Sequence, residues 1–375
     1  MRLDERWRRE LDRLDHEGRL RRLSTPNGID FSSNDYLGYA RRPIETQTLS
    51  PSGTASRLLR GHHAVWEQVE ATLANWHGAE AALTFTSGYV ANEGVLSAAI
   101  ESGDLVFSDQ FNHASIIDGL RLSRAEKIIY PHRDVDALQA ALQQRHGRRS
   151  PKQAWFLVTE SLFGMEGDVA PLCELAELAA RYDIHLVVDE AHATGCFGPT
   201  GSGLVDRLGL RDRVLATIHT GGKALAVPGA YVAGSRLLID LLVNRCRHFI
   251  FTTALPPQVG AWWLEALQRV RRDDAGRRRL HENAAMFRSA AKERRLGGSE
   301  FIAAWTIGGD RDAVAAASRL QERGFDVRAI RPPTVPEGTA RLRISIHADH
   351  DRDTLAALAS ALTSGDAGLG SASSG

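Results

Sequence analysis

The chain has 375 residues, of which 46 are acidic, 46 are basic and 43% are hydrophobic. The balanced charge gives no indication of a nucleic acid or an anionic membrane as a partner, and no apolar run approaches the roughly 20 residues that cross a bilayer. The three cysteines lie far apart, which argues against a disulfide scaffold or a zinc ribbon and fits a reducing cytoplasm. We therefore expect a cytoplasmic globular protein without a metal site.

The N-terminal segment predicts an amphipathic helix. Its apolar residues recur at helical spacing, at Leu3, Trp7, Leu11 and Leu14. Such a stripe is typical of a helix that docks on another surface. We expect residues 1–45 to form this helix and a connecting segment.

Short apolar runs alternate with helical stretches between about Ala81 and Gly234. The runs are AALTFT, DLVFSD, KIIYP, AWFLVTE, IHLVVDE, RVLATIHT and AYVAG, and the stretches between them include VANEGVLSAAIESG, DVDALQAALQQRHG and PLCELAELAARYD. This alternation predicts the α/β class, with a mostly parallel sheet covered by helices on both faces. Ligands bind such sheets outside the carboxyl ends of the strands. We place this large domain at residues 46–272.

A charged stretch, RRDDAGRRR, marks a domain boundary at residues 271–279. Beyond it, FIAAWTIGG, FDVRAI and ARLRISI read as strands of a smaller α+β domain, which we place at residues 273–362. Residues 363–375 offer almost nothing to bury and predict a disordered tail.

The predicted strand IHLVVDE ends in carboxylates and is followed by an imidazole. Asp189 comes at the carboxyl end of the strand, and His192 follows three residues later. A carboxylate in a dry pocket pairs strongly with a cation, and the protonated pyridine nitrogen of pyridoxal phosphate is such a cation. Taken alone, Asp189 is better explained as a helix N-cap or a loop salt bridge, and a lone histidine is usually structural.

Lys223 is one of only four lysines and lies in the glycine-flanked, apolar stretch IHTGGKALAVPGA. Desolvation lowers the pKa of such a lysine and frees its amine as a nucleophile. This context suits a Schiff-base lysine, although a surface lysine in a flexible loop fits it about as well.

Two further turns offer candidate contacts. In FTSGYVANEG, the Ser87 hydroxyl and the amides of Gly88 and Tyr89 would face a phosphate at a helix N-terminus. In FNHASIIDG, His113 follows a strand, where an imidazole can stack on a planar ring. Many unrelated turns look like the first, and a turn histidine is the simpler interpretation of the second.

Near the C-terminus, IRPPTVPEGTARLRISI places Thr334 among rigid prolines and spaces Arg341 and Arg343 on one strand face. One of these arginines would hold a carboxylate through two parallel hydrogen bonds. An exposed, solvated strand face is the competing interpretation.

Taken together, these motifs resemble the α-oxoamine synthases, a family of fold-type I pyridoxal-phosphate enzymes. The resemblance runs from about Leu20 to His350, and its carriers are DFSSNDYLG, SRLLRG, FTSGYVAN, NHAS, TESLFGMEGD, VVDEAHATG, HTGGKAL, FTTALPP and IRPPTVPEGTARLR. It implies a fold-type I transferase that uses pyridoxal 5'-phosphate in an active site shared across a homodimer.

The resemblance also implies a role for each matching residue. Lys223 would bind the cofactor covalently and move the α-proton of the amino acid. Asp189 would hold the pyridine nitrogen, His192 the ring oxygen, and His113 would stack on the ring. The further implied cofactor contacts are Ser87, Gly88, Tyr89, Glu160 and Thr220, with Thr252 or Thr253 reaching the partner subunit's phosphate. Arg343 would hold the substrate carboxylate, and Arg21 and Thr334 lie at positions near the acyl substrate.

The last motif points to the members of the family that join L-alanine to a pimeloyl thioester with loss of carbon dioxide, in biotin biosynthesis. A sibling such as glycine C-acetyltransferase would use the same cofactor chemistry. An aminotransferase or lyase on the same fold, or a non-catalytic relative, is a more distant alternative. Three positions depart from the family pattern: Gly164 stands where serine is frequent, Gly221 where an aromatic is common, and Trp66 where histidine is frequent.

Overall fold

The computed structural model describes residues 2–363 and contains two compact units. The central unit comprises residues 37–163 and 169–277. The terminal unit comprises the described parts of 1–36, 164–168 and 278–375. The sequence-based domain limits at residues 45/46 and 272/273 stay a prediction. Of the expected tail, Thr363 is the last residue of a helix, and residues 364–375 lie outside the described residues.

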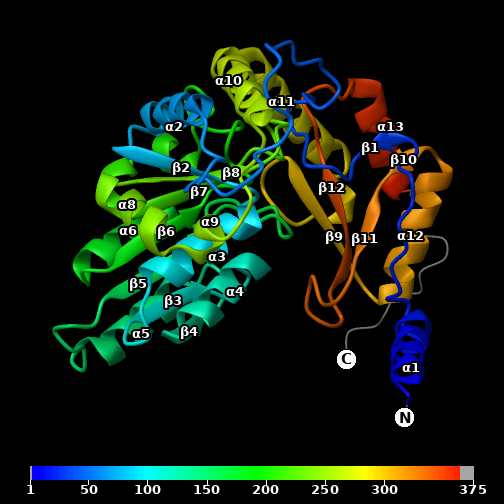
Figure 1. The fold of residues 1–375 in the computed structure, drawn as a ribbon. Helices are drawn as coiled ribbons and strands as arrows, with labels where there is room; N and C mark the ends of the chain where they lie inside the picture. The colour runs from blue at the N-terminus through cyan, green and yellow to red at the C-terminus, as the bar shows by residue number, and fades with distance from the viewer. Residues whose placement is uncertain (1, 364–375) are drawn as a thin grey trace. The chain divides into compact units, whose positions relative to one another are not determined.

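The central unit is built on a seven-stranded sheet (Figure 1). Its strands are β2 (Ala81–Phe85), β3 (Leu105–Asp109), β4 (Glu126–Tyr130), β5 (Trp155–Glu160), β6 (His185–Asp189), β7 (Ala216–Thr220) and β8 (Ala230–Gly234), in the spatial order β2-β8-β7-β6-β5-β3-β4. All pairs are parallel except the two that involve β8. Each strand falls on a predicted apolar run, so the predicted α/β fold with a mostly parallel sheet is confirmed.

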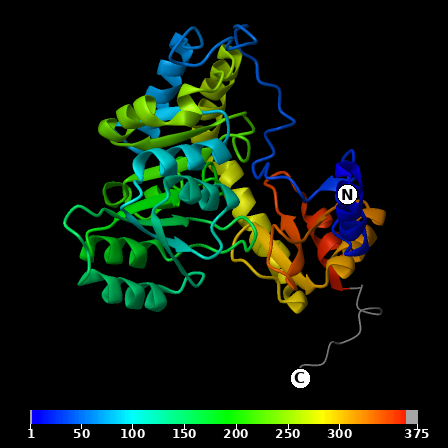
Figure 2. The same cartoon turned by 60° about the horizontal axis from the view of Figure 1, so that its bottom comes forward.

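Helices cover both faces of this sheet (Figures 1 and 2). They are α2 (Ala64–His77), α3 (Gly88–Ala99), α4 (Ala114–Ser123), α5 (Val135–His146), α6 (Leu172–Arg181), α7 (Leu204–Arg207), α8 (Arg236–Arg245), α9 (Arg247–Ile250) and α10 (Pro257–Arg272), with a 3₁₀ turn, η1, at Arg211–Arg213. The three long helical stretches predicted from the sequence correspond to α3, α5 and α6.

The alternation of side chains along β7 and β8 separates the two faces. Ile218 and Val232 point into the apolar core that contains α3, α4 and α8. Their neighbours His219 and Tyr231 point to the other face, where their rings stack at 4.6 Å and Tyr231 meets Trp263 of α10. This is the period-two pattern of a sheet that is buried on both sides.

The terminal unit contains a three-stranded antiparallel sheet in the order β11-β12-β9 and a short parallel pair, β1-β10. Its strands are β1 (Ile29–Asp30), β9 (Ile302–Gly308), β10 (Phe325–Asp326), β11 (Arg328–Ile330) and β12 (Ala340–Ser345). Its helices are α1 (Leu3–His16), α12 (Asp310–Glu322), α13 (Arg352–Thr363) and the 3₁₀ turn η2 (Lys292–Arg294), while α11 (Asp274–Ala290) begins in the central unit.

Helix α1 forms where the sequence predicts it, and its docking on another surface stays a prediction. No residue of α1 is buried, and Leu3, Trp7 and Leu11 are each about half exposed. The helix touches its unit at its C-terminal end, where Arg311 of α12 donates to the carbonyl of His16. Within residues 2–363 no helix is both long and apolar enough to span a membrane.

Candidate active site

The carboxyl ends of the central strands converge on one edge of the sheet. Glu160 and Asp189, the last residues of β5 and β6, are partners in register. Thr220 at the end of β7 and Phe85 at the end of β2 both lie opposite Ala230 of β8. The turns that follow β2 and β7 therefore lie at the same edge as Asp189, which is where ligands bind in sheets of this kind.

Asp189 is buried and held by two donors. Its Oδ1 accepts the N–H of Ala191 at 2.8 Å, and its Oδ2 accepts the side-chain amide of Asn92 at 2.6 Å. The same Asn92 nitrogen also donates to the Ser115 hydroxyl, at 3.0 Å. These bonds fix the carboxylate plane before any ligand arrives. Asn92 and Ser115 were missed from the sequence, although a polar residue inside the apolar stretch VANEGVLSAA was a usable signal for Asn92.

His113 is linked to Asp189 through this set of bonds. It is the N-cap of α4, and its Nδ1 lies 2.7 Å from the Ser115 hydroxyl. Its backbone N–H donates to Oε1 of Glu160, at 2.8 Å. Burial lowers the pKa of His113, the carboxylate of Asp189 raises it in part, and the charge of Lys223 lowers it further. Its ring is therefore neutral near pH 7 and apolar enough to face an aromatic ring.

Lys223 lies in the turn after β7, and its Nζ is 2.7 Å from Nε2 of His192. His192 is buried and Lys223 is half-buried. Since the charge of Lys223 also acts on His113, the structure brings Lys223, His192, Asp189 and His113 into one cluster. The sequence predicted these four residues from three motifs, with Asp189 and His192 in the same one.

The turn after β2 opens α3, a helix of 12 residues. A Cβ added to Gly88 would lie 3.4 Å from Cβ of Thr220, so the two candidate phosphate contacts are neighbours. The Ser87 hydroxyl accepts the N–H of Val90 at 3.3 Å and so caps its own helix, while its contact with the phosphate stays a prediction. Tyr89 is partly exposed, its hydroxyl donates to Asp118, and its ring meets His113 edge-on.

Thr252 and Thr253 lie in the loop between α9 and α10. Thr252 is half-buried and lines a small cavity together with Phe85 and Thr86, while Thr253 is exposed. That Thr252 or Thr253 contacts the cofactor phosphate bound by a partner subunit stays a prediction.

The other candidate residues belong to the terminal unit. Arg341 forms a buried ion pair with Glu166, at 3.0 Å. Arg343 is buried without any carboxylate partner among residues 2–363. It donates to the Gly164 carbonyl, to the Ser345 hydroxyl at 2.8 Å, to Asn34 at 2.7 Å and to the Tyr36 hydroxyl at 3.0 Å. Of the two arginines on β12, Arg343 is therefore the one that keeps an unneutralised charge.

Arg21 and Thr334 lie near the same segment of the terminal unit. Arg21 is exposed and donates to the Pro332 carbonyl at 3.1 Å, and Thr334 is exposed, with its N–H bonded to the carbonyl of Arg331. Gly164 offers Arg343 its carbonyl, a contact that does not depend on the side chain at that position.

Two other departures from the family pattern have a packing explanation. A Cβ at Gly221 would lie 2.5 Å from Cζ2 of Trp263 and 2.5 Å from the Val227 carbonyl, so Trp263 fills the space that a side chain at position 221 would need. Trp66 is fully buried in the central unit, on α2.

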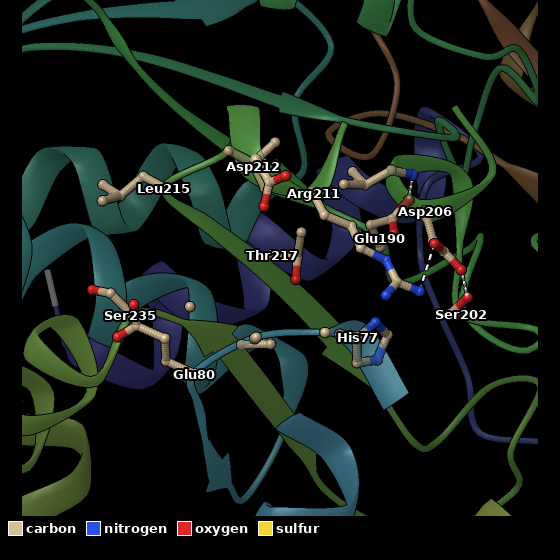
Figure 3. Close-up of a pocket in the computed structure, with 16 residues that line it drawn as sticks. His77, Glu80, Glu190, Ser202, Asp206, Arg211, Asp212, Leu215, Thr217 and Ser235 are labelled. Atoms are coloured by element: carbon tan, nitrogen blue, oxygen red, sulfur yellow. Dashed lines mark hydrogen bonds and ion pairs between the residues drawn. The ribbon is translucent and has the colours of Figure 1, made fainter. Parts of the chain in front are cut away.

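A separate cavity of about 260 Å³ lies beside Glu190, the residue after Asp189 (Figure 3). It is lined by His77, Ser202, Asp206 and Arg211 among others, and Asp206 pairs with Arg211 at 2.5 Å. Burial raises the pKa of Glu190 to about 7, although the Ser161 hydroxyl and the amides of Val205 and Leu204 lower it in part. None of the four clustered residues around Lys223 lines this cavity.

The cluster around Lys223 fits pyridoxal phosphate in its chemistry. Lys223 offers a primary amine for the aldehyde, and Asp189 offers a buried carboxylate for the pyridine nitrogen. The N-terminus of α3 offers backbone amides for the phosphate, and Gly88 leaves its part of that site without a side chain, next to Thr220.

Comparisons with known proteins agree with this arrangement. Residues 26–362 match the family described as aminotransferase class I and II. Proteins named 8-amino-7-oxononanoate synthase are 45% identical in Anaeromyxobacter dehalogenans (94% of each chain covered) and 42% identical in Aromatoleum aromaticum (89% of this chain, 88% of the relative).

Solved structures of the same group are similar in fold. A serine palmitoyltransferase from S. paucimobilis, with a bound PLP–myriocin aldimine, has a TM-score of 0.86 and 26% sequence identity. The match covers 97% of this chain and 98% of the serine palmitoyltransferase chain. An 8-amino-7-oxononanoate synthase from Francisella tularensis has a TM-score of 0.73 and 27% sequence identity, and the match covers 90% of this chain and 98% of that one. The chain therefore belongs to the class I and II aminotransferase family and, within it, to the pyridoxal-phosphate-dependent acyltransferases called α-oxoamine synthases.

Proposed function

We propose that this enzyme condenses L-alanine with a pimeloyl thioester, releasing carbon dioxide and the free thiol and forming 8-amino-7-oxononanoate for biotin synthesis. The relatives that are 42–45% identical over about nine-tenths of the chain carry this activity in their names, which supports the choice of substrates. The cofactor chemistry rests on one observation: the glycine-flanked Lys223 meets His192 at 2.7 Å, at the edge of the sheet where Asp189 ends β6.

When bound, pyridoxal phosphate draws electrons from the α-carbon of an attached amino acid, which makes loss of a proton or of carbon dioxide possible. In the proposal, Asp189 keeps a proton on the pyridine nitrogen, because a buried carboxylate stabilises a cation beside it. Asn92 and the Ala191 amide hold Asp189 in place. Lys223 takes the α-proton of alanine at its Nζ and returns a proton later.

The substrate carboxylate is assigned to Arg343. A buried guanidinium that lacks a carboxylate partner favours an anionic ligand, because burying an unpaired charge is costly. Its neighbour Arg341 is already neutralised by Glu166. His113 supplies a neutral ring for the cofactor face, and His192 reaches the ring oxygen. Ser87, Gly88, Tyr89 and Thr220 surround the phosphate, and Glu160 positions His113 through its backbone.

A homodimer with shared active sites is part of the proposal, because Thr252 or Thr253 is assigned to the partner's phosphate. Arg21 and Thr334 are assigned to the acyl chain. The three cysteines are free thiols, two of them buried, which fits a reducing compartment such as the cytoplasm.

The test is an absorbance titration of the wild type and of Lys223→Ala with pyridoxal phosphate, then L-alanine and glycine. A yellow band that requires Lys223 and shifts preferentially with alanine supports the proposal. Release of free thiol from pimeloyl-coenzyme A or pimeloyl-acyl carrier protein then identifies the acyl carrier. A shift with glycine alone would assign a sibling activity such as glycine C-acetyltransferase, and alanine deamination without thiol release would assign an aminotransferase.

A further inference from the structure

The contact between Lys223 and His192 joins two bases. A hydrogen bond over 2.7 Å between Nζ and Nε2 needs a proton on one nitrogen and a lone pair on the other. A lysine ammonium has no lone pair, and an imidazolium has none at Nε2. The contact therefore has one bridging proton: either the ammonium donates to a neutral imidazole, or the imidazole donates to a neutral amine.

We propose that His192 is the proton acceptor for Lys223 when the lysine amine forms its covalent bond to the cofactor aldehyde. The inference rests on the proposed cofactor site and adds a role for His192 that precedes any contact with the ring oxygen. Lysine in water holds its proton up to about pH 10, and a protonated amine is not a nucleophile. A base in direct contact with Nζ removes that obstacle.

The step balances without any oxidant or reductant. Nε2 of His192 takes one proton from the Lys223 ammonium, and the freed lone pair on Nζ attacks the aldehyde carbon. The carbonyl oxygen leaves as water with two of the three ammonium protons, one of them delivered by His192. The third proton stays on the nitrogen of the new C=N bond, and His192 returns to its initial state.

The surrounding charges favour one shared proton at this pair. Asp189 and Glu160, at the ends of β6 and β5, place carboxylates around the cluster and stabilise one positive charge. His113 at the start of α4 is neutral, because burial and the charge of Lys223 both lower its pKa. In the turn after β6, burial raises the pKa of Glu190 to about 7, so this carboxyl carries only part of its negative charge near pH 7. On β7, burial lowers the pKa of His219 well below its usual range.

The test measures the covalent step apart from catalysis. Apoprotein is mixed rapidly with pyridoxal phosphate at several concentrations, and the growth of the yellow band gives a limiting rate and a half-saturation concentration. The variants are His192→Gln and His192→Ala. The matched control is His185→Gln, at the opposite, exposed end of the same strand β6. Binding of pyridoxamine phosphate, which has no aldehyde, reports whether each variant keeps a folded site.

We expect the limiting rate of both His192 variants to fall about 100-fold at pH 7, the scale of general base catalysis. In the variants the limiting rate should rise about tenfold per pH unit between pH 7 and 9, because only neutral lysine reacts. Added imidazole should restore much of the rate of His192→Ala. The wild type and His185→Gln should have the same rate.

Three results would overturn the inference. The first is a limiting rate of His192→Gln equal to that of the wild type. The second is a reduced rate of His192→Ala that added imidazole does not restore. The third is a change in the affinity for pyridoxamine phosphate alone, which would mean that His192 only helps to bind the cofactor. A wild type that forms no yellow band at all would instead contradict the proposed function itself.

Discussion

The side-chain amide of Asn92, on α3, donates to the Asp189 carboxylate at the end of β6 over 2.6 Å. The two residues are far apart in the sequence, and both are buried. The same amide nitrogen reaches Ser115, whose hydroxyl lies 2.7 Å from His113. One asparagine therefore links the residue assigned to the pyridine nitrogen with the residue assigned to the ring face.

Asn92→Ala should destabilise the apoprotein and weaken cofactor binding together. The substitution removes one of the two donors to the buried Asp189 carboxylate and the amide donor to Ser115, which costs about 1–3 kcal/mol in the free energy of unfolding. Urea unfolding and pyridoxal phosphate titration measure the two effects. The control is Asn244→Ala, an exposed asparagine on α8 whose side chain donates to the Asp240 carbonyl; it should change stability by less than about 0.5 kcal/mol. Equal effects of the two variants would contradict the role assigned to Asn92.

Gly203→Ala should be much more damaging than Gly209→Ala. Both glycines have positive φ, +113° and +69°, so alanine strains the backbone at each. A Cβ at Gly203 would also lie 2.0 Å from Oε2 of Glu190, whereas a Cβ at Gly209 would meet nothing within 4 Å. We expect a loss of roughly 1–2 kcal/mol for Gly209→Ala from the backbone alone. The loss for Gly203→Ala should exceed about 3 kcal/mol, because the carboxyl of Glu190 must also move.

Denaturant unfolding of the two glycine variants gives the comparison directly. Similar losses would mean that the Glu190 carboxyl does not anchor the loop around Gly203.

Glu190→Gln should reduce the pH dependence of stability in a defined direction. Burial raises the pKa of Glu190 to about 7 in the folded protein, above the usual value of 4.5. The folded state then binds more protons than the unfolded state between these two values, so stability is full below about pH 4.5 and falls as the pH rises to about 7. Over that range the wild type should lose roughly 3 kcal/mol relative to Glu190→Gln.

The measurement is the difference in unfolding free energy between the wild type and Glu190→Gln at each pH. The low pKa of buried His77, about 3, affects both proteins equally and so cancels in the difference. The glutamine side chain can still accept the N–H of Leu204. It can also donate to the nearby Ser161 hydroxyl, which lowers the pKa of the Glu190 carboxyl but forms no hydrogen bond of good geometry among residues 2–363. Glu174→Gln, exposed on α6, is the control, and a flat difference would contradict the raised pKa.

Arg343→Lys and Arg341→Lys should separate substrate binding from structure. Both variants keep a positive charge, but lysine cannot make two parallel hydrogen bonds to a carboxylate. At position 343 we expect KM for L-alanine to rise about tenfold or more, since hydrogen bonds to charged groups contribute about 1.5–3 kcal/mol. At position 341 a lysine can keep the ion pair with Glu166, so KM should change less than about twofold. Steady-state rates at varied alanine decide between them, and the opposite pattern would assign the carboxylate to Arg341.

Local sequence determined the elements of this protein and the chemistry that its motifs offer. Apolar runs such as IHLVVDE became strands because their side chains are buried on both faces of a parallel sheet. Their order along the chain then placed Asp189 and Glu160 at one edge, since parallel strands end on the same side. Lys223, His192 and His113 could be named from short motifs for the same reason: each comes a few residues after the end of a predicted strand.

Tertiary structure alone decided which groups meet. Three sets of contacts join residues that are distant in sequence. Asn92 bonds to Asp189 and Ser115, and Trp263 fills the space beside Gly221. Glu166 pairs with Arg341 and so distinguishes it from Arg343. No local pattern encodes such contacts, because they depend on how helices pack on the sheet and on loop geometry. The exposed apolar stripe of α1 is the converse case: periodicity predicted the helix, but periodicity says nothing about what covers it.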